Sequence, residues 1–91
     1  MSEDFPGSAR LSHLRKGERA QISSLLAPQG AEQAATHERL QELGFLPGET
    51  LRVIATAIPA GDPIAVRIGN TTFALRRHEA EMICIERQMP A

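Results

Sequence analysis

Three histidines are the side chains of this sequence best suited to metal chemistry. His13, His37 and His78 are far apart, and no two have the three- or four-residue spacing that places a ligand pair on one helix face. His78 is flanked by Glu79 and Glu81, which makes a partial site of one imidazole and one carboxylate. A physiological site needs three or four convergent ligands. We therefore expect solvated histidines and no required cofactor, with weak zinc or Fe(II) binding, or a metal bridge between two chains, as the alternatives.

The residues that could act as nucleophiles lack the surroundings that catalysis needs. Cys84 stands between Ile83 and Ile85 in an expected strand, so it reads as an inert, partly buried thiol. As the single cysteine it excludes an internal disulfide and a four-cysteine zinc site. No Gly-x-Ser-x-Gly elbow is present, and Pro47-Gly48 precedes a strand, so no helix start follows to cradle a phosphate. We expect no enzymatic activity.

Composition narrows the classes of partner. The 91 residues suffice for one domain, and the net charge of −1 argues against a nucleic-acid binder. Because the chain has no Trp, no Tyr and three Phe, it can build neither a proline-peptide groove nor a base-stacking platform. No apolar run approaches the ~20 residues that span a bilayer, and residues 1–9 lack the pattern of a signal peptide. We expect a cytoplasmic protein that reaches a membrane through a partner.

A helix followed by a sharp turn is the clearest local signal. Residues 31–43 are rich in Ala, Glu and Gln, and their narrow apolar stripe suits a helix on the edge of a sheet. Gly44 stands where a helix end needs positive φ, and Pro47-Gly48 fits the middle of a type II turn. From Leu51 the apolar pattern takes the two-residue period of a strand.

A hairpin around Gly69-Asn70 is the best-determined strand pair. A two-residue turn there predicts that Ile68 faces Thr71, Val66 faces Phe73 and Ile64 faces Leu75. A slip of one residue would bury Arg67 and expose Val66, so the register is strongly specified. Residues 19–26 and 82–87 are further strands, and residues 77–80 form a single helical turn before the last one.

These elements add up to a mainly β protein, a small barrel of about five strands with one inserted helix at residues 31–43. We expect a flexible tail at residues 1–10, one domain at residues 11–87 and a C-terminal tail at residues 88–91. Ser12 is expected to cap a short turn that runs through Lys16 and closes at Gly17.

Three motifs, in order, make the sequence similar to a known family. Residues 40–48 read LQELGFLPG, residues 58–63 read IPAGDP, and residues 75–80 read LRRHEA before a last hydrophobic stretch. This order resembles the ferrous iron transport protein A (FeoA) family over about residues 11–87, and residues 11–17 (LSHLRKG) fit its start. The resemblance implies an SH3-like β-barrel that assists a ferrous-iron permease bearing a cytosolic GTPase domain.

A docking surface for such a partner would use apolar residues in turns. If the turn tips are neighbours, they form one patch with a charged rim that includes Glu49. We expect Phe45, by contrast, to plug the end of the barrel, and Arg76 to pair with Asp62 or Glu49. The candidate partner-binding residues are Leu46, Ile58, Pro59, Ala60, Asp62, Pro63 and Arg76.

Two other functions remain open at this point. The SH3-like C-terminal domain of iron-dependent repressors is similar, which makes a metal-responsive regulatory module the main alternative. A homodimer, formed through an open edge strand or bridged by a metal at a histidine, is the other.

Overall fold

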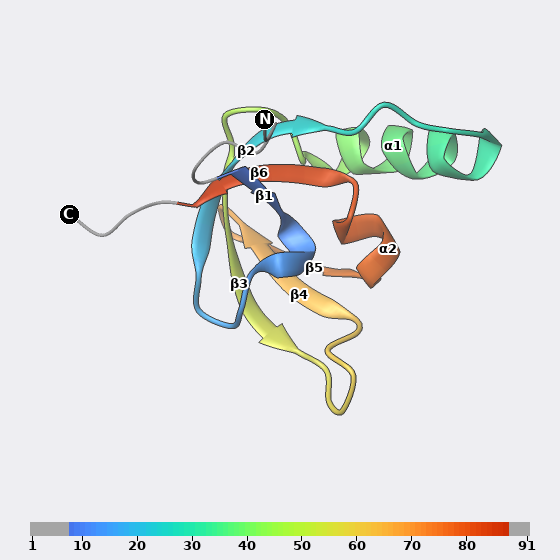
Figure 1. Cartoon of the computed structure of the whole chain (residues 1–91). Coiled ribbons are helices and arrows are strands. Elements are labelled where there is room, and N and C mark those ends of the chain that lie inside the picture. Colours follow the sequence, from blue (N-terminus) through green and yellow to red (C-terminus); the bar gives the residue numbers. More distant parts are fainter. Residues whose placement is uncertain (1–7, 88–91) are drawn as a thin grey trace, which may run out of the picture.

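The computed structural model describes residues 8–87, which form six strands, two α-helices and one 3-10 helix (Figure 1). In chain order the elements are β1 (Ser8–Arg10), η1 (Leu11–His13), β2 (Arg19–Leu25), α1 (Ala31–Leu43), β3 (Thr50–Thr56), β4 (Ile64–Ile68), β5 (Thr71–Leu75), α2 (Arg77–Ala80) and β6 (Ile83–Arg87).

The strands form one antiparallel sheet in the order β1-β6-β2-β3-β4-β5. The mainly β fold with one inserted helix is confirmed, but the sheet has six strands instead of about five, and it does not close, because β1 and β5 are both edges. The additional strand is β1, Ser8–Arg10, which we had placed in the N-terminal tail. It pairs with β6, with Ala9 opposite Ile85, and a partner so distant in sequence leaves no local signal. The rest of the expected tails, residues 1–7 and 88–91, lies outside the described residues.

Helix α1 ends as its sequence predicts. Gly44 has φ 107°, its N–H donates to the Gln41 carbonyl (3.1 Å), and the Phe45 N–H donates to the Leu40 carbonyl (3.0 Å). These two bonds are the Schellman motif, which satisfies carbonyls left free at a helix end. Gly48 then has φ 94°, and the Glu49 N–H donates to the Leu46 carbonyl (3.1 Å), so the expected type II turn is present.

The β4–β5 hairpin has the predicted register, with Ile64 opposite Leu75, Val66 opposite Phe73 and Ile68 opposite Thr71. This alternation buries Val66 and exposes Arg67. Helix α2 also has the expected bounds. The hydrophobic core consists of Leu11, Leu14, Ala20, Ile22, Leu40, Phe45, Leu51, Val53, Ile64, Val66, Leu75, Ala80, Met82, Ile83 and Ile85.

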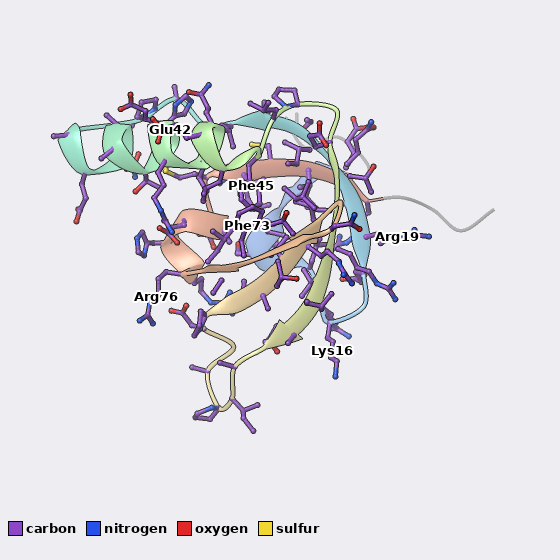
Figure 2. The ribbon with its side chains drawn as sticks, turned by 180° about the vertical axis from the view of Figure 1, so that it is seen from behind. Lys16, Arg19, Glu42, Phe45, Phe73 and Arg76 are labelled. Carbon is purple, nitrogen blue, oxygen red and sulfur yellow. The ribbon has the colours of Figure 1, made fainter. Side chains whose placement is uncertain are left out.

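Phe45 enters this core from the turn after α1 and lies against Phe73, with ring centroids 5.3 Å apart (Figure 2). Its expected burial is confirmed, although the sheet does not close into a barrel that it could plug. Of α1 itself, Leu40 is buried, while residues 31–35 are exposed. A salt bridge from Arg39 to the largely buried Glu79 ties α1 to α2. The helix is therefore held at its C-terminal half.

The expected Ser12 cap is wrong. Ser12 lies inside η1, and its hydroxyl donates to Glu81 Oε2 (2.7 Å) beyond the end of α2. The Arg10 guanidinium donates to the Glu81 carbonyl (3.2 Å) as well. Because this partner is remote in sequence, the hydroxyl joins the N-terminal segment to the C-terminal one instead of closing a local turn. The turn at Lys16-Gly17 is present.

Candidate functional site

The three histidines do not converge. His13 is exposed, and its Nδ1 accepts a hydrogen bond from the Arg10 N–H (3.3 Å). His78 is exposed on α2, whereas His37 is half-buried on α1, where we had expected it on the solvent side. Within residues 8–87, no group of three or more His, Cys, Asp or Glu side chains is arranged to hold a metal ion. Cys84 is half-buried, as its position between two core isoleucines predicts.

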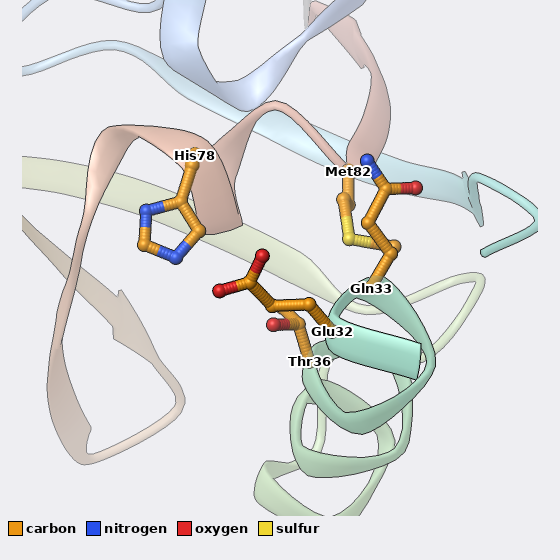
Figure 3. A pocket seen from close by; sticks show the side chains of 5 residues that line it. All are labelled: Glu32, Gln33, Thr36, His78 and Met82. Carbon is orange, nitrogen blue, oxygen red and sulfur yellow. The ribbon is translucent and has the colours of Figure 1, made fainter. Parts of the chain in front are cut away.

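A hollow of about 240 Å³ lies between the two helices (Figure 3). Glu32, Gln33 and Thr36 line it from α1, and His78 and Met82 line it from α2 and the turn that follows. Figure 3 shows the His78 ring turned toward the Glu32 carboxylate. The hollow therefore offers one imidazole and one carboxylate, two donors where a metal centre needs three or four. Its two walls come from distant parts of the chain, and nothing in the sequence signals that they meet.

The turn tips are not neighbours, so the condition for a single apolar patch is not met. Leu46 precedes β3 and the segment Ile58-Pro59-Ala60 follows it, so the seven residues of that strand separate the two by about 20 Å. Figure 1 shows the two loops at opposite ends of the sheet. Both are exposed: the Leu46 side chain is 42% accessible and that of Ile58 is 90% accessible. The molecule therefore presents two apolar tips in place of one surface.

The β3–β4 loop, residues 57–63, is the more prominent tip and is held by several hydrogen bonds. The Ala57 N–H donates to the Pro63 carbonyl (3.0 Å), and the Gly61 N–H donates to the Ala57 carbonyl (2.6 Å). The base of the loop is tied to α2, because the Arg77 N–H donates to Asp62 Oδ1 (2.9 Å). These hydrogen bonds hold the base of the loop, and Ile58 is exposed at its tip.

The ion pair expected for Arg76 is absent. Within residues 8–87 the salt bridges join Arg39 to Glu79 and Arg87 to Glu18, and neither involves Arg76. Asp62 instead accepts the hydrogen bond from the first N–H of α2, a donor that would otherwise lack a partner at the helix start. Arg76 stays exposed, and its N–H donates to Glu79 Oε1 (2.8 Å).

In the described part of the chain, no helix has both the length and the apolar character needed to cross a bilayer.

Comparison with known proteins gives a consistent assignment. The FeoA domain model matches residues 9–87. Stenotrophomonas maltophilia FeoA, solved with zinc and put forward as a bacterial ferrous iron transport activating factor, is 36% identical; the match covers 86% of this chain and 89% of that one, with a TM-score of 0.75. Chlorobium tepidum FeoA is also 36% identical, over 89% of this chain and 71% of that one, with a TM-score of 0.74.

The fold also occurs in a protein far less similar in sequence. T. acidophilum IdeR is 15% identical over 96% of this chain and 37% of that one, with a TM-score of 0.75, a likeness of fold alone. A comparison with curated proteins gives no match for this sequence. Since the domain model spans nearly all of the described residues and the FeoA structures share their SH3-like fold with them, the chain belongs to the FeoA family.

Proposed function

We propose that this FeoA domain is a non-enzymatic adaptor that docks on the cytosolic GTPase region of a ferrous-iron membrane transporter. Membership of the FeoA family supports the link to ferrous iron transport, and the S. maltophilia relative has been put forward as an activating factor. In this proposal the domain works in the cytoplasm and is recruited to the membrane by its partner.

The observation that carries the proposal is the exposure of Ile58 at the end of an anchored loop. A large aliphatic side chain that is 90% accessible gains by burial against a partner. Pro59 and Ala60 are exposed beside it and extend the apolar tip. Because hydrogen bonds hold the loop at its base, little conformational freedom is lost on binding.

The other candidate residues take different positions in this proposal. Asp62 fixes the loop to α2, and Pro63 closes its base through the hydrogen bond from Ala57. Arg76, exposed at the start of α2, is placed to contact a partner at the side of the loop. Leu46, at the far end of β3, would belong to a second contact.

Docking alters transport if the partner is bound more tightly in one state than in another. When the domain saturates the partner, the equilibrium constant between the two states shifts toward the favoured state by the ratio of the two affinities. In this mechanism the domain needs no catalytic group, since it changes nucleotide turnover through the partner's own equilibrium.

The test is calorimetric titration of the transporter's isolated GTPase domain with wild type and three variants. Ile58→Asp should weaken binding by about tenfold or more, the loss typical of a residue at the centre of an interface. Ala27→Asp, at another exposed loop residue, is the matched control and should bind like wild type. Leu46→Asp reports on the second tip. Equal affinity of all four proteins would refute docking through these loops, and a lower thermal midpoint for Ile58→Asp would instead assign that residue to stability.

Metal binding is a second candidate function, favoured by the zinc complex of the S. maltophilia relative and by Glu32 and His78 in the hollow. With two donors the hollow would bind zinc or Fe(II) weakly, either for metal-responsive regulation or as a bridge between two copies. Anaerobic titration of wild type and His78→Ala with each ion measures the affinity. If binding is unchanged by the substitution, the hollow is not the site. If a dimer persists after chelation, the bridge is excluded.

A further inference from the structure

Three arginines form a row across the middle of the sheet. Arg19 of β2 lies directly opposite Arg52 of β3, and Arg52 lies directly opposite Arg67 of β4. Directly opposed residues project from the same face with Cβ atoms about 4.5–5.5 Å apart. All three side chains are exposed. We refer to Arg19, Arg52 and Arg67 as the arginine row.

Within the part of the chain that the structure describes, no acidic side chain forms a salt bridge with this row. The salt bridges within residues 8–87, Arg39 with Glu79 and Arg87 with Glu18, involve none of its members. Glu86 of β6 is opposite Gln21, two residues along β2 from Arg19, and forms no salt bridge with it. Like charges directly opposite one another destabilise a sheet. The protein therefore keeps three adjacent positive charges on one face at a cost to its own folding.

The rest of this face is polar on one side of the row and apolar on the other, where Ala55, Ala65 and Ala74 lie opposite one another across β3, β4 and β5. Gln21 and Thr50 are opposite each other on one side of the row, and Thr72 is opposite Arg67 on β5; all three are exposed. A ligand for this face gains most by bringing negative charge to the row, with the small alanine side chains beside it available for apolar contact.

The spacing of the row favours carboxylates on a helix. Neighbouring strands are about 4.7–4.9 Å apart, and side chains three and four residues apart on a helix have Cβ atoms about 5–6 Å apart. Guanidinium groups also bind carboxylates through paired hydrogen bonds. We propose that the arginine row binds an acidic helix of a partner protein, with Asp or Glu recurring every three or four residues. This inference takes one element from the proposed function, namely that the partner of the domain is a protein.

Other anionic partners fit the described residues less well. Of the two phenylalanine rings in residues 8–87, Phe45 is buried and Phe73 is half-buried, so the described residues offer no exposed Phe, Tyr or Trp ring for a base to stack on. Attraction to an anionic membrane is typical of clusters of about four to eight basic residues. The net charge of −1 also disfavours general binding to either polyanion.

The experiment measures fluorescence anisotropy of a labelled helical peptide of about 20 residues, with Glu at alternating three- and four-residue intervals, at about 50 mM salt. A peptide with Gln in place of each Glu is the control ligand. We expect the acidic peptide alone to bind, and its affinity to fall as salt is raised. Arg52→Gln should weaken binding about two- to fivefold, and the triple change of Arg19, Arg52 and Arg67 to Gln more than tenfold.

A matched control variant separates binding from stability. Arg39→Gln removes one positive charge from α1, away from the row, so it should keep wild-type affinity while lowering the thermal midpoint. Arg52→Gln should show the reverse, with weaker binding and an equal or higher midpoint, because it relieves repulsion within the row.

The inference is overturned if Arg52→Gln and the triple variant bind the acidic peptide as wild type does, or if the peptide does not bind. It is also overturned if duplex DNA, or vesicles with about one-third phosphatidylserine, bind while the peptide does not. These results do not depend on the transporter. A failed peptide titration beside a positive Ile58→Asp result would remove the arginine row from the account and leave the adaptor function in place.

Discussion

Replacing Val66 with alanine tests the register and the core together. Val66 is fully buried at the centre of β4, opposite Val53 on β3 and Phe73 on β5. The change removes two buried methyl groups, about 1.6 kcal/mol of transfer free energy at about 0.8 kcal/mol each. The cavity left beside close-packed neighbours adds to this loss. We expect the free energy of unfolding to fall by about 2 kcal/mol, within a range of about 1–3 kcal/mol.

Equilibrium unfolding in urea measures this loss directly. A decrease of about 2 kcal/mol should lower the thermal midpoint of a domain of this size by roughly 8–16 °C. Arg67→Ala is the matched control, because Arg67 is next in the strand and faces solvent. It should leave the stability unchanged or raise it slightly. If Arg67→Ala were the more destabilising change, the faces of β4 would be reversed and the account of both the core and the arginine row would fail.

Two further substitutions test how α1 is held. Arg39→Gln should lower the free energy of unfolding by about 1–2 kcal/mol, because it leaves the buried Glu79 carboxylate with fewer partners. The loss is limited because the Arg39 side chain is half-exposed to solvent. Hydrogen exchange should also quicken along α1, with Glu38→Gln as the neutral control; unchanged exchange would show that the salt bridge does not hold the helix. Gly44→Ala should cost about 1–2 kcal/mol for its positive φ alone, since an added Cβ meets no atom within 4 Å, and Gly44→Asn should cost less. Equal stability of Gly44→Ala and wild type in urea would contradict the Schellman ending.

Local signals in the sequence were sufficient for much of the fold. The bounds of α1 and α2, the type II turn at Pro47-Gly48 and the register of the β4–β5 hairpin follow from residues close in the chain. Each depends on a dihedral preference or on short-range alternation. The burial of Phe45 also follows from local pattern, because the turn directs an aromatic side chain back toward the sheet.

Features that depend on distant pairing could not be read in the same way. Strand β1 forms because it pairs with the distant strand β6, with Ala9 opposite Ile85. The hydrogen bond from Ser12 to Glu81 likewise joins residues that are far apart in the sequence. The hollow joins Glu32 to His78 across the α1–α2 contact. The loop that carries Leu46 and the β3–β4 loop lie at opposite ends of β3. Their separation follows from the extended course of that strand in the structure.

The arginine row illustrates the same limit. Alternation in each strand places Arg19, Arg52 and Arg67 on the solvent face, and that much is visible in the sequence. Their alignment depends on the register between β2, β3 and β4, which the intervening α1 and the β3–β4 loop set. No property of one strand indicates that the three charges stand side by side.

The measurement that tests the central claim most directly is the change in amide chemical shifts of the labelled protein when the transporter's GTPase domain is added. Docking through the β3–β4 loop predicts that the largest changes fall on residues 57–63, with smaller changes at the arginine row. If no amide chemical shift changes when an equimolar amount of the GTPase domain is present, the adaptor function is contradicted. Changes confined to the hollow between α1 and α2 would refute docking through the loop and move the contact to the hollow.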